Sequence, residues 1–269
     1  MKRALPYILL ALGAAIMGYP FLWMLGTAFK TFPESLATPS SPFPKTLQWG
    51  NFAEAFRAAP FGRYFLNSLI TSTLSGAAVA VTSLLAGYAF ARIAFRGRTI
   101  LFGLLLATMM VPFEVTFIPN FATITWLGWY NTYAALIVPW CANVFGIFLV
   151  RQAFLAIPPD LYDAATIDGC GHLRFLRHAG APLVRPALAA VFLFSFLGSY
   201  NALLWPLIVT GDTSMRVVQV GLAAFLLDAG VRLNLLMCAS SIVIVPGILL
   251  YLATQRHFGE SNLGAGLKG

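Results

Sequence analysis

The sequence predicts an all-α membrane protein with six transmembrane helices. Of the 269 residues, 59% are hydrophobic and only 10% are charged, and the mean hydropathy is +0.80. A soluble domain carries about 25% charged residues, so this chain has too little polar surface to be covered by water. It also contains long charge-free runs, and roughly 20 apolar residues span a bilayer as a helix. Each span has to be helical, because lipid offers no partner for free backbone groups.

Six charge-poor segments are long enough to serve as spans. They are residues 5–29, 64–91, 99–119, 132–150, 187–209 and 233–255. The charge-free run 115–150 is too long for one helix, and the sequence WLGWYNTY at 126–133 supplies a turn with interfacial tryptophans. The first apolar run, 4–29, exceeds the roughly 7–15 residues of a signal-peptide core. We therefore expect it to be retained as a helix.

Lysine and arginine are shared unequally between the loops of the two sides. With the N-terminus inside, the inner side holds Lys2, Arg3, Arg92, Arg96, Arg98, Arg151, Arg174, Arg177, Arg185, Arg256 and Lys268. The outer side holds Lys30, Lys45, Arg57, Arg63, Arg216 and Arg232. This inner excess predicts that both termini are cytoplasmic, in a multi-pass protein of the cell (inner) membrane. The net charge of +8 is then explained by the orientation of the chain in the membrane. The basic residues are scattered over short loops and give no reason to expect nucleic-acid binding.

The segment between the first two spans, 30–62, is rich in proline. Its prolines are Pro33, Pro39, Pro42, Pro44 and Pro60. This density favours extended, turn-rich structure. We expect an outer tether between an accessory first helix and a five-helix core, and the alternative at 51–61 is a short amphipathic helix. The chain accordingly divides into 1–62, a core at 63–255 and a cytosolic tail at 256–269.

The second span contains small residues at every fourth position. They are Ser68, Ser72, Gly76 and Ala80. A ridge of small residues lets helix backbones approach closely in lipid, so we favour a packing role for this ridge. The alternative is a stripe of hydroxyl groups that lines a pore.

The third span carries a carboxylate between two prolines, in the sequence VPFEVTFIPN at 111–120. Pro112 and Pro119 each remove a backbone donor and loosen the helix. Along a straight helix that starts near Thr99, Glu114 lies roughly 22 Å into the membrane. A carboxylate at such depth usually faces a cavity or a partner. Two interpretations stay open: Glu114 caps or salt-bridges a helix end near the outer interface, or it lines a transport path.

The fifth span ends in FLGSYNALLWPLIVTGD at 196–212. Asn201, Trp205 and Pro206 place an amide, an aromatic ring and a helix break close together. Aromatic stacking and amide hydrogen bonds suit a sugar, so a pathway lining is one interpretation. A tryptophan at a membrane interface is the other. The apolar segment 217–227 that follows is too short to span, and we expect it at the outer interface.

The largest expected cytosolic loop is 151–186. Pro158 and Pro159 end the preceding helix, and DLYDAATID at 160–168 predicts a short new one. One face of this helix carries Leu161, Ala164, Ala165 and Asp168, and its two small alanines allow close approach by another protein. Gly169 is expected to end the helix in a left-handed conformation. A second, basic helical stretch is expected at 172–178.

This loop resembles the EAA loop of ATP-binding-cassette (ABC) importer permeases, where E-A-A-x-x-x-G precedes a Leu-Pro some ten residues later. Here the pattern reads Asp163-Ala164-Ala165-Thr-Ile-Asp168-Gly169, followed by Ala181-Pro182-Leu183. The flanking IPPDLYDAA and PLVRP, with VPFEVTFIP, FLGSYNALLWPL and QRHFGESNLGAGLKG elsewhere, are similar to the carbohydrate branch. The similarity is to the second membrane subunit of maltose-type and glycerol-phosphate-type importers. The chain departs from the pattern at Asp163, which replaces glutamate, and at 179–182, where Ala-Gly-Ala-Pro replaces Ile-x-Leu-Pro.

The resemblance implies a type I ABC importer permease fold and a role in the import of a sugar or a glycerol phosphate. It implies that the loop docks on an ATPase subunit. The implied docking residues are Leu161, Asp163, Ala164, Ala165, Asp168 and Gly169. The implied partners are a homologous second permease, an ABC ATPase dimer that binds ATP and magnesium, and an extracytoplasmic sugar-binding protein. Glu114, Asn201 and Trp205 are the candidate pathway residues of this chain.

Other functions find less support in the sequence. The chain lacks G-x-x-x-x-G-K-[ST], H-E-x-x-H and G-x-S-x-G, so we expect no catalytic residues and no cofactor of its own. Cys170, His172 and His178 match no usual zinc spacing, so no metal site is expected. The alternative function is an ion-coupled carrier that uses Glu114. Such carriers typically show inverted repeats and more than six spans.

Overall fold

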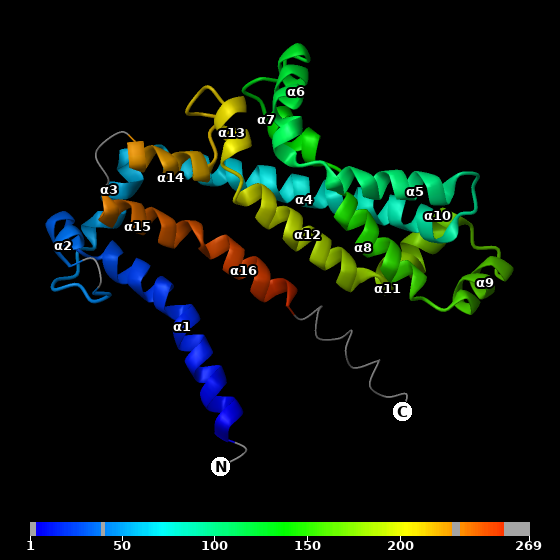
Figure 1. Cartoon of the computed structure of the whole chain (residues 1–269), viewed down its shortest axis with the longest axis horizontal. Coiled ribbons are helices and arrows are strands. Elements are labelled where there is room, and N and C mark those ends of the chain that lie inside the picture. The colour runs from blue at the N-terminus through cyan, green and yellow to red at the C-terminus, as the bar shows by residue number, and fades with distance from the viewer. Residues whose placement is uncertain (1–3, 39–40, 228–231, 256–269) are drawn as a thin grey trace. The chain divides into compact units, whose positions relative to one another are not determined.

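The computed structural model describes residues 4–38, 41–227 and 232–255. These residues form helices and connecting turns, with no strand among them (Figure 1). The chain divides into two compact units. The first comprises Met1–Phe65 and Arg216–Pro246, and the second comprises Leu66–Met215 and Gly247–Gly269.

Three helical segments are each long and apolar enough to cross a membrane. They are Leu5–Ala28 in α1 (Ala4–Ala28), α4 (Phe61–Arg92), and Leu233–Thr254, formed by α15 (Leu233–Val243) and α16 (Val245–Thr254). Three further spans arise if each bent pair of helices counts as one. These pairs are Arg98–Met110 with Phe113–Trp126 (98°), Tyr133–Trp140 with Val144–Leu155 (43°), and His172–Leu183 with Arg185–Tyr200 (78°). The described residues therefore provide up to six spans, the number that the sequence predicts.

The third span is broken rather than loosened. The 3-10 turn η1 (Thr108–Met110) ends α5 (Arg98–Ala107), and α6 (Phe113–Trp126) starts in a direction 98° away (Figure 1). Pro112 causes the break, because it lacks a backbone donor and holds the preceding residue in an extended conformation. The span expected at 99–119 is therefore present as a bent pair of helices, and the predicted loosening is a full break. The depth of roughly 22 Å for Glu114 is wrong, since it assumed a straight helix.

The fifth span is also interrupted. Helix α12 (Arg185–Tyr200) ends at Asn201, and a separate helix α13 (Leu204–Val209) follows. In a continuous helix the ring of Pro206 would clash with the carbonyl group of Ala202, four residues earlier. The helix break predicted near Pro206 is therefore present, and the first helix of the expected span 187–209 ends at Tyr200.

In the first unit, α15 packs against α1 and α3 (Gly50–Ala58). Ala28, Ala55, Leu235 and Cys238 form the buried contact between these three helices. The segment 30–62 contains α3 and the short α2 (Phe32–Ala37), so its fold is more than the extended tether that we favoured. The alternative of a short helix near 51–61 is the one that the structure contains. The apolar segment near 217–227 forms α14 (Val218–Leu227).

In the second unit, α4 packs closely against α8 (Val144–Leu155) and α12. Gly146 in α8 permits this approach, because a Cβ atom there would overlap the Ser83 hydroxyl and lie 3.0 Å from Val191 of α12. The ridge of small residues on α4 also packs: Ser68 and Ser72 are buried, and Gly76 lies against Phe192. These contacts support the packing role that we favoured. The remaining elements of this unit before residue 158 are α7 (Tyr133–Ile137) and the 3-10 turn η2 (Val138–Trp140).

Candidate functional site

The predicted docking helix is present as α9 (Pro159–Ile167), within one residue of the range 160–168. Pro159 occupies its first position, where the missing backbone donor costs nothing. At its other end Gly169 has φ +74°, as the sequence predicts. The amide of Gly169 donates to the carbonyl of Thr166, and the amide of Cys170 donates to the carbonyl of Ala165, at 3.0 and 2.9 Å. These two bonds form a Schellman motif, which satisfies carbonyl groups at the end of the helix.

Most of the predicted docking residues are open to contact. None of the residues of α9, all of which the structure describes, is buried. Leu161 is 45% exposed, and Asp163, Ala164 and Asp168 are exposed as well. Ala165 differs, because it is half-buried and packs with its neighbours on a hydrophobic cluster of the second unit. The open face of α9 is therefore narrower than the sequence suggests.

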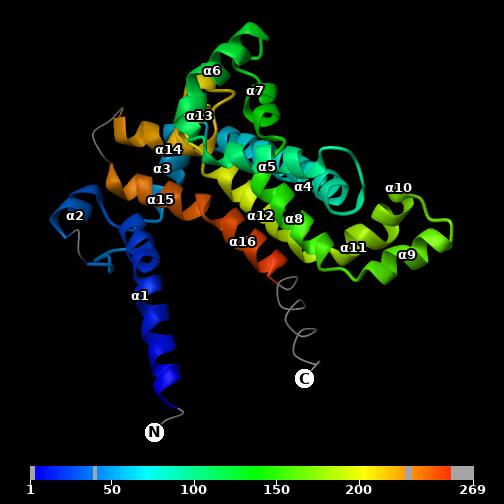
Figure 2. The same ribbon diagram turned by 45° about the vertical axis from the view of Figure 1, so that its right-hand side comes forward.

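Two apolar side chains that the sequence analysis did not select extend the exposed surface. Ile167 in α9 is 86% exposed, and Leu173 in α10 (His172–Phe175) is 76% exposed. Helix α10 lies beside α9, near the C-terminal end of α4 (Figures 1 and 2). Exposed apolar side chains such as Leu161 and Ile167 of α9 and Leu173 of α10 are costly in water unless another surface covers them. In the sequence, apolar residues placed between the charged residues of this loop are the feature that could have indicated the larger contact surface.

The opposite face of α9 packs against α10 and α4, which belong to the same unit. The ring of Tyr162 meets that of Phe175 edge to face at 5.1 Å and stacks on His172 at 6.2 Å. The hydroxyl of Tyr162 lies 3.1 Å from Nδ1 of His172, and the hydroxyl of Tyr88 lies 2.9 Å from the same nitrogen. Tyr88 belongs to α4, so these contacts join α9 to a transmembrane helix. Tyr88 could not be identified from the sequence, because nothing in its local pattern reveals a partner 84 residues away.

An irregular helical segment connects the loop to the next transmembrane helix. A π-helical turn, η3 (Leu176–Gly180), follows α10, and α11 (Ala181–Leu183) leads to the 78° bend before α12. Gly180 lies against Phe154, where an added Cβ atom would be 3.1 Å from the ring. In this segment His178 makes contact through Nδ1 with the carbonyl of Arg174 at 3.0 Å. Among the described residues, no three His, Cys, Asp or Glu side chains come together as a metal site.

Trp205 is buried and packs against other aromatic side chains. It is 4% exposed, and its indole N–H donates to the carbonyl of Ala135 at 2.9 Å. Its ring meets those of Phe117 and Trp140 edge to face at 5.9 and 5.7 Å. Phe113 touches both of these rings, at 5.5 and 5.3 Å, which closes a group of four aromatic side chains. We call Phe113, Phe117, Trp140 and Trp205 the aromatic box.

The other two pathway candidates lie at helix ends. Glu114 is exposed in the first turn of α6, where a carboxylate stabilises the positive end of the helix dipole. Asn201 is exposed at the C-terminal cap of α12. The structure brings Trp205 against α6, which carries Glu114, through the Phe117 contact. These positions agree with the interpretation of Glu114 as a residue at a helix end.

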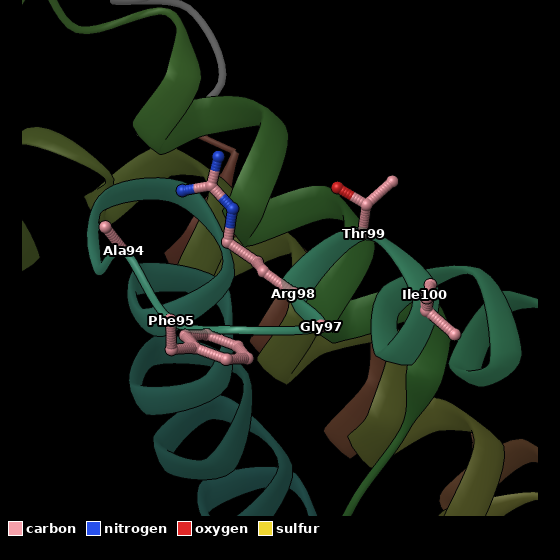
Figure 3. A pocket seen from close by; sticks show the side chains of 6 residues that line it. All are labelled: Ala94, Phe95, Gly97, Arg98, Thr99 and Ile100. Carbon is pink, nitrogen blue, oxygen red and sulfur yellow. The ribbon is translucent and has the colours of Figure 1, made fainter.

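A shallow depression of about 400 Å³ lies at the turn between α4 and α5 (Figure 3). It is lined by Ala94, Phe95, Gly97, Arg98, Thr99 and Ile100. The guanidinium group of Arg98 donates to the carbonyl of Ile93 at 3.3 Å. None of the predicted docking or pathway residues lines it.

The sequence matches a family described as "Binding-protein-dependent transport system inner membrane component" over residues 79–261. Similar curated proteins cover nearly the whole chain. The diacetylchitobiose uptake system permease protein NgcG of Streptomyces coelicolor is 32% identical, over 96% of this chain and 86% of its own. The arabinooligosaccharides transport system permease protein AraQ of Halalkalibacterium halodurans is 33% identical, over 95% and 93%. The sn-glycerol-3-phosphate transport system permease protein UgpE of Agrobacterium fabrum is 31% identical, over 96% and 95%.

A solved structure has the same fold. It is the crystal structure of a bacterial ABC transporter involved in the import of the acidic polysaccharide alginate. Its TM-score is 0.79 at 21% identity, with 96% of each chain covered. The predicted type I ABC importer permease fold is thus confirmed, and the alternative of an ion-coupled carrier receives no support. With its apolar spans, the chain is a multi-pass inner-membrane permease subunit, and it belongs to the family of binding-protein-dependent transport system inner membrane components.

Proposed function

We propose that this chain forms half of the translocation pathway of a carbohydrate importer and receives the work of ATP hydrolysis through α9. The substrate class rests on the relatives, whose names specify diacetylchitobiose, arabinooligosaccharides and sn-glycerol-3-phosphate. The proposed substrate is therefore a small sugar, an oligosaccharide or a sugar-like phosphate.

One observation carries the docking role. Helix α9 is a short, fully described helix with no buried residue, and the Asp163-to-Gly169 motif covers its second half and its C-terminal cap. Its outer face offers Leu161 and Ile167 for apolar contact and Asp163 for a basic partner residue. An interface of this kind combines an apolar centre with charged groups that select the partner. An ATPase groove with complementary positive charge fits this surface.

The proposed complex contains a second permease, an ATPase dimer and an extracytoplasmic binding protein. ATP and magnesium belong to the ATPase, which has to bind one conformer of the permease pair better than the other to drive transport. The binding protein delivers the substrate. A similar fold, with a TM-score of 0.65 and 16% identity, occurs in a bacterial alginate ABC transporter in complex with a pentasaccharide-bound periplasmic protein.

The proposed orientation follows from the docking role. An ATPase that uses cellular ATP has to meet α9 in the cytoplasm, which is the side with the larger number of basic residues. Both termini then lie in the cytoplasm, and Glu114, Asn201 and Trp205 belong towards the outer part of the protein. The proposed cytosolic tail, 256–269, lies outside the described residues.

Charge reversal at Asp163 tests the docking role. Asp163→Arg places a positive charge on the exposed face of α9, where it should repel a basic groove. We expect the complex to lose most of its ATPase during affinity purification, while the permease pair stays intact. Arg96→Glu is the matched control, since it reverses an exposed charge in the neighbouring α4–α5 turn. Full retention of the ATPase by Asp163→Arg would contradict the proposed function.

A further inference from the structure

The C-terminal turns of α4 hold α9 from one side. Tyr88 and Arg92 lie four residues apart and therefore on the same face of α4. The Tyr88 ring is 3% exposed, and its hydroxyl reaches Nδ1 of His172 at 2.9 Å. The Tyr162 hydroxyl of α9 lies 3.1 Å from the same nitrogen. One imidazole thus connects a transmembrane helix to the docking helix.

The direction of the hydrogen bonds at His172 depends on where its imidazole ring carries a proton. A neutral imidazole with its proton on Nε2 has one lone pair on Nδ1, which the hydroxyl groups of Tyr88 and Tyr162 share as donors. A ring with a proton on Nδ1, whether neutral or cationic, instead donates that proton towards the phenol oxygens. In either state His172 bridges the two tyrosines, and removal of either hydroxyl group breaks the hydrogen-bonded bridge through this imidazole.

Arg92 fastens the start of the docking helix. Its guanidinium group donates to the carbonyls of Phe154 and Ile157, at 2.8 and 2.6 Å. Phe154 lies in the last turn of α8, and Ile157 lies in the short connection between α8 and Pro159, where α9 begins. The same guanidinium lies 6.0 Å from the centre of the Tyr162 ring, close enough for a cation–π attraction. One face of α4 therefore contacts both the entrance and the inner face of α9.

The other segments next to α9 hold it less firmly in place. Its outer residues are exposed, and the chain leaves it through Gly169 and Gly171, around which an added Cβ atom would meet open space. By contrast, α4 packs tightly against α8 next to Tyr88. A Cβ atom at Gly87 would lie 2.9 Å from Cγ1 of Val150 and 3.0 Å from the amide nitrogen of Arg151. A displacement of α9 is therefore passed to α4, and through the close contact of Gly87 with Val150 to α8.

We propose that Tyr88, Arg92, His172 and Tyr162 form a clamp that makes α9 move as one body with the C-terminal end of α4. These four are positioning residues: they touch neither ATP nor sugar, and they set how much of the ATPase movement reaches the transport path. The proposal rests on the proposed function, because it requires an ATPase on the outer face of α9.

The test compares four single variants in the complete complex, reconstituted in liposomes with its binding protein. Tyr88→Phe and Tyr162→Phe each remove one hydroxyl group and keep the ring. His172→Leu removes the bridge, and His172→Asn restores an oxygen acceptor near the position of Nδ1. The measurements are ATPase co-purification and the number of sugar molecules imported per ATP hydrolysed.

We expect every variant to keep the ATPase. The import-to-hydrolysis ratio should fall about two-fold or more in each tyrosine variant and further in His172→Leu, and His172→Asn should recover part of it. Tyr251→Phe is the matched control, because it removes an exposed hydroxyl group at the end of α16. Its ratio should equal that of the wild type.

An unchanged ratio in the tyrosine variants overturns the clamp, as does a His172→Asn variant no better than His172→Leu. Loss of the ATPase from Tyr162→Phe also contradicts it, since the outer face of α9 is unaltered in that variant. Failure of the docking role has a different signature, namely retention of the ATPase by Asp163→Arg. The two failures are therefore distinguishable, and the tyrosine variants keep the test decisive if His172→Leu does not fold.

Discussion

Helix α9 and the aromatic box around α13 both carry conspicuous side chains, and they use them in opposite ways. In α9 the apolar Ile167 is 86% exposed and the acidic Asp163 is open to a partner. In α13 the indole of Trp205 is 4% exposed, and its N–H is already bonded to Ala135. The difference shows that exposure of the side chain, more than its chemical type, separates a contact residue from a packing residue. Trp205 has the chemistry that suits a sugar, but the structure uses that chemistry internally.

The largest expected effect is loss of stability on truncation of Trp205. Trp205→Ala removes the ring that closes the aromatic box and leaves the Ala135 carbonyl without its donor. We expect a loss of about 3–5 kcal/mol in the free energy of unfolding, measured by denaturation in detergent. Trp205→Phe should cost about 1–3 kcal/mol, mainly through the lost hydrogen bond.

Trp126→Ala is the control for this comparison, since Trp126 is 84% exposed at the end of α6. It should change stability far less than Trp205→Ala does. A Trp205→Ala protein that unfolds like the wild type, yet no longer imports sugar, would return Trp205 to the pathway.

The second expected effect lies at the end of α9 and concerns the backbone. Gly169 has φ +74° with open space around it, so a side chain there meets conformational strain and no clash. Gly169→Ala should destabilise the end of α9 by about 1–2 kcal/mol, and Gly169→Asn should cost less because asparagine tolerates this conformation. Faster hydrogen exchange in the peptide 159–171 would report the change.

Gly171→Ala provides the matched control two residues away. Gly171 has φ −70°, which any residue adopts, and an added Cβ atom there meets nothing within 4 Å. This variant should leave exchange unchanged or slow it slightly, because alanine restricts the unfolded chain. Equal exchange rates in the alanine variants of Gly169 and Gly171 would show that the left-handed turn does not hold the helix.

The contrast also explains which features the sequence could reveal. The range of α9 and the conformation of Gly169 depend on proline, glycine and helix-forming residues within a dozen positions, so local rules suffice. The six spans depend on composition and are equally local. The 98° break at Pro112 was visible only as a weakening, because a missing donor does not fix the direction of the next helix.

The remaining features depend on contacts that are distant in sequence. The burial of Trp205 requires Phe117, Trp140 and Ala135 to meet it, and no local pattern encodes that meeting. The bridge from Tyr88 to His172 spans 84 residues. The spacing of Tyr88 and Arg92 on one face of α4 was readable, but two such residues at a helix end commonly serve as membrane-interface anchors. Only the fold distinguishes the two roles.

The smallest expected effect is at Glu114, which tests whether any pathway role remains for it. Its carboxylate is exposed in the first turn of α6, so Glu114→Gln should cost about 0.3–1 kcal/mol through the helix dipole. ATP-driven import in membrane vesicles should stay within about two-fold of the wild type, because a helix-end charge of this strength does not gate transport. An imposed proton gradient without ATP should drive no import in either protein. If Glu114→Gln instead abolishes import while its stability is unchanged, the carboxylate belongs to the transport path and the helix-end interpretation is wrong.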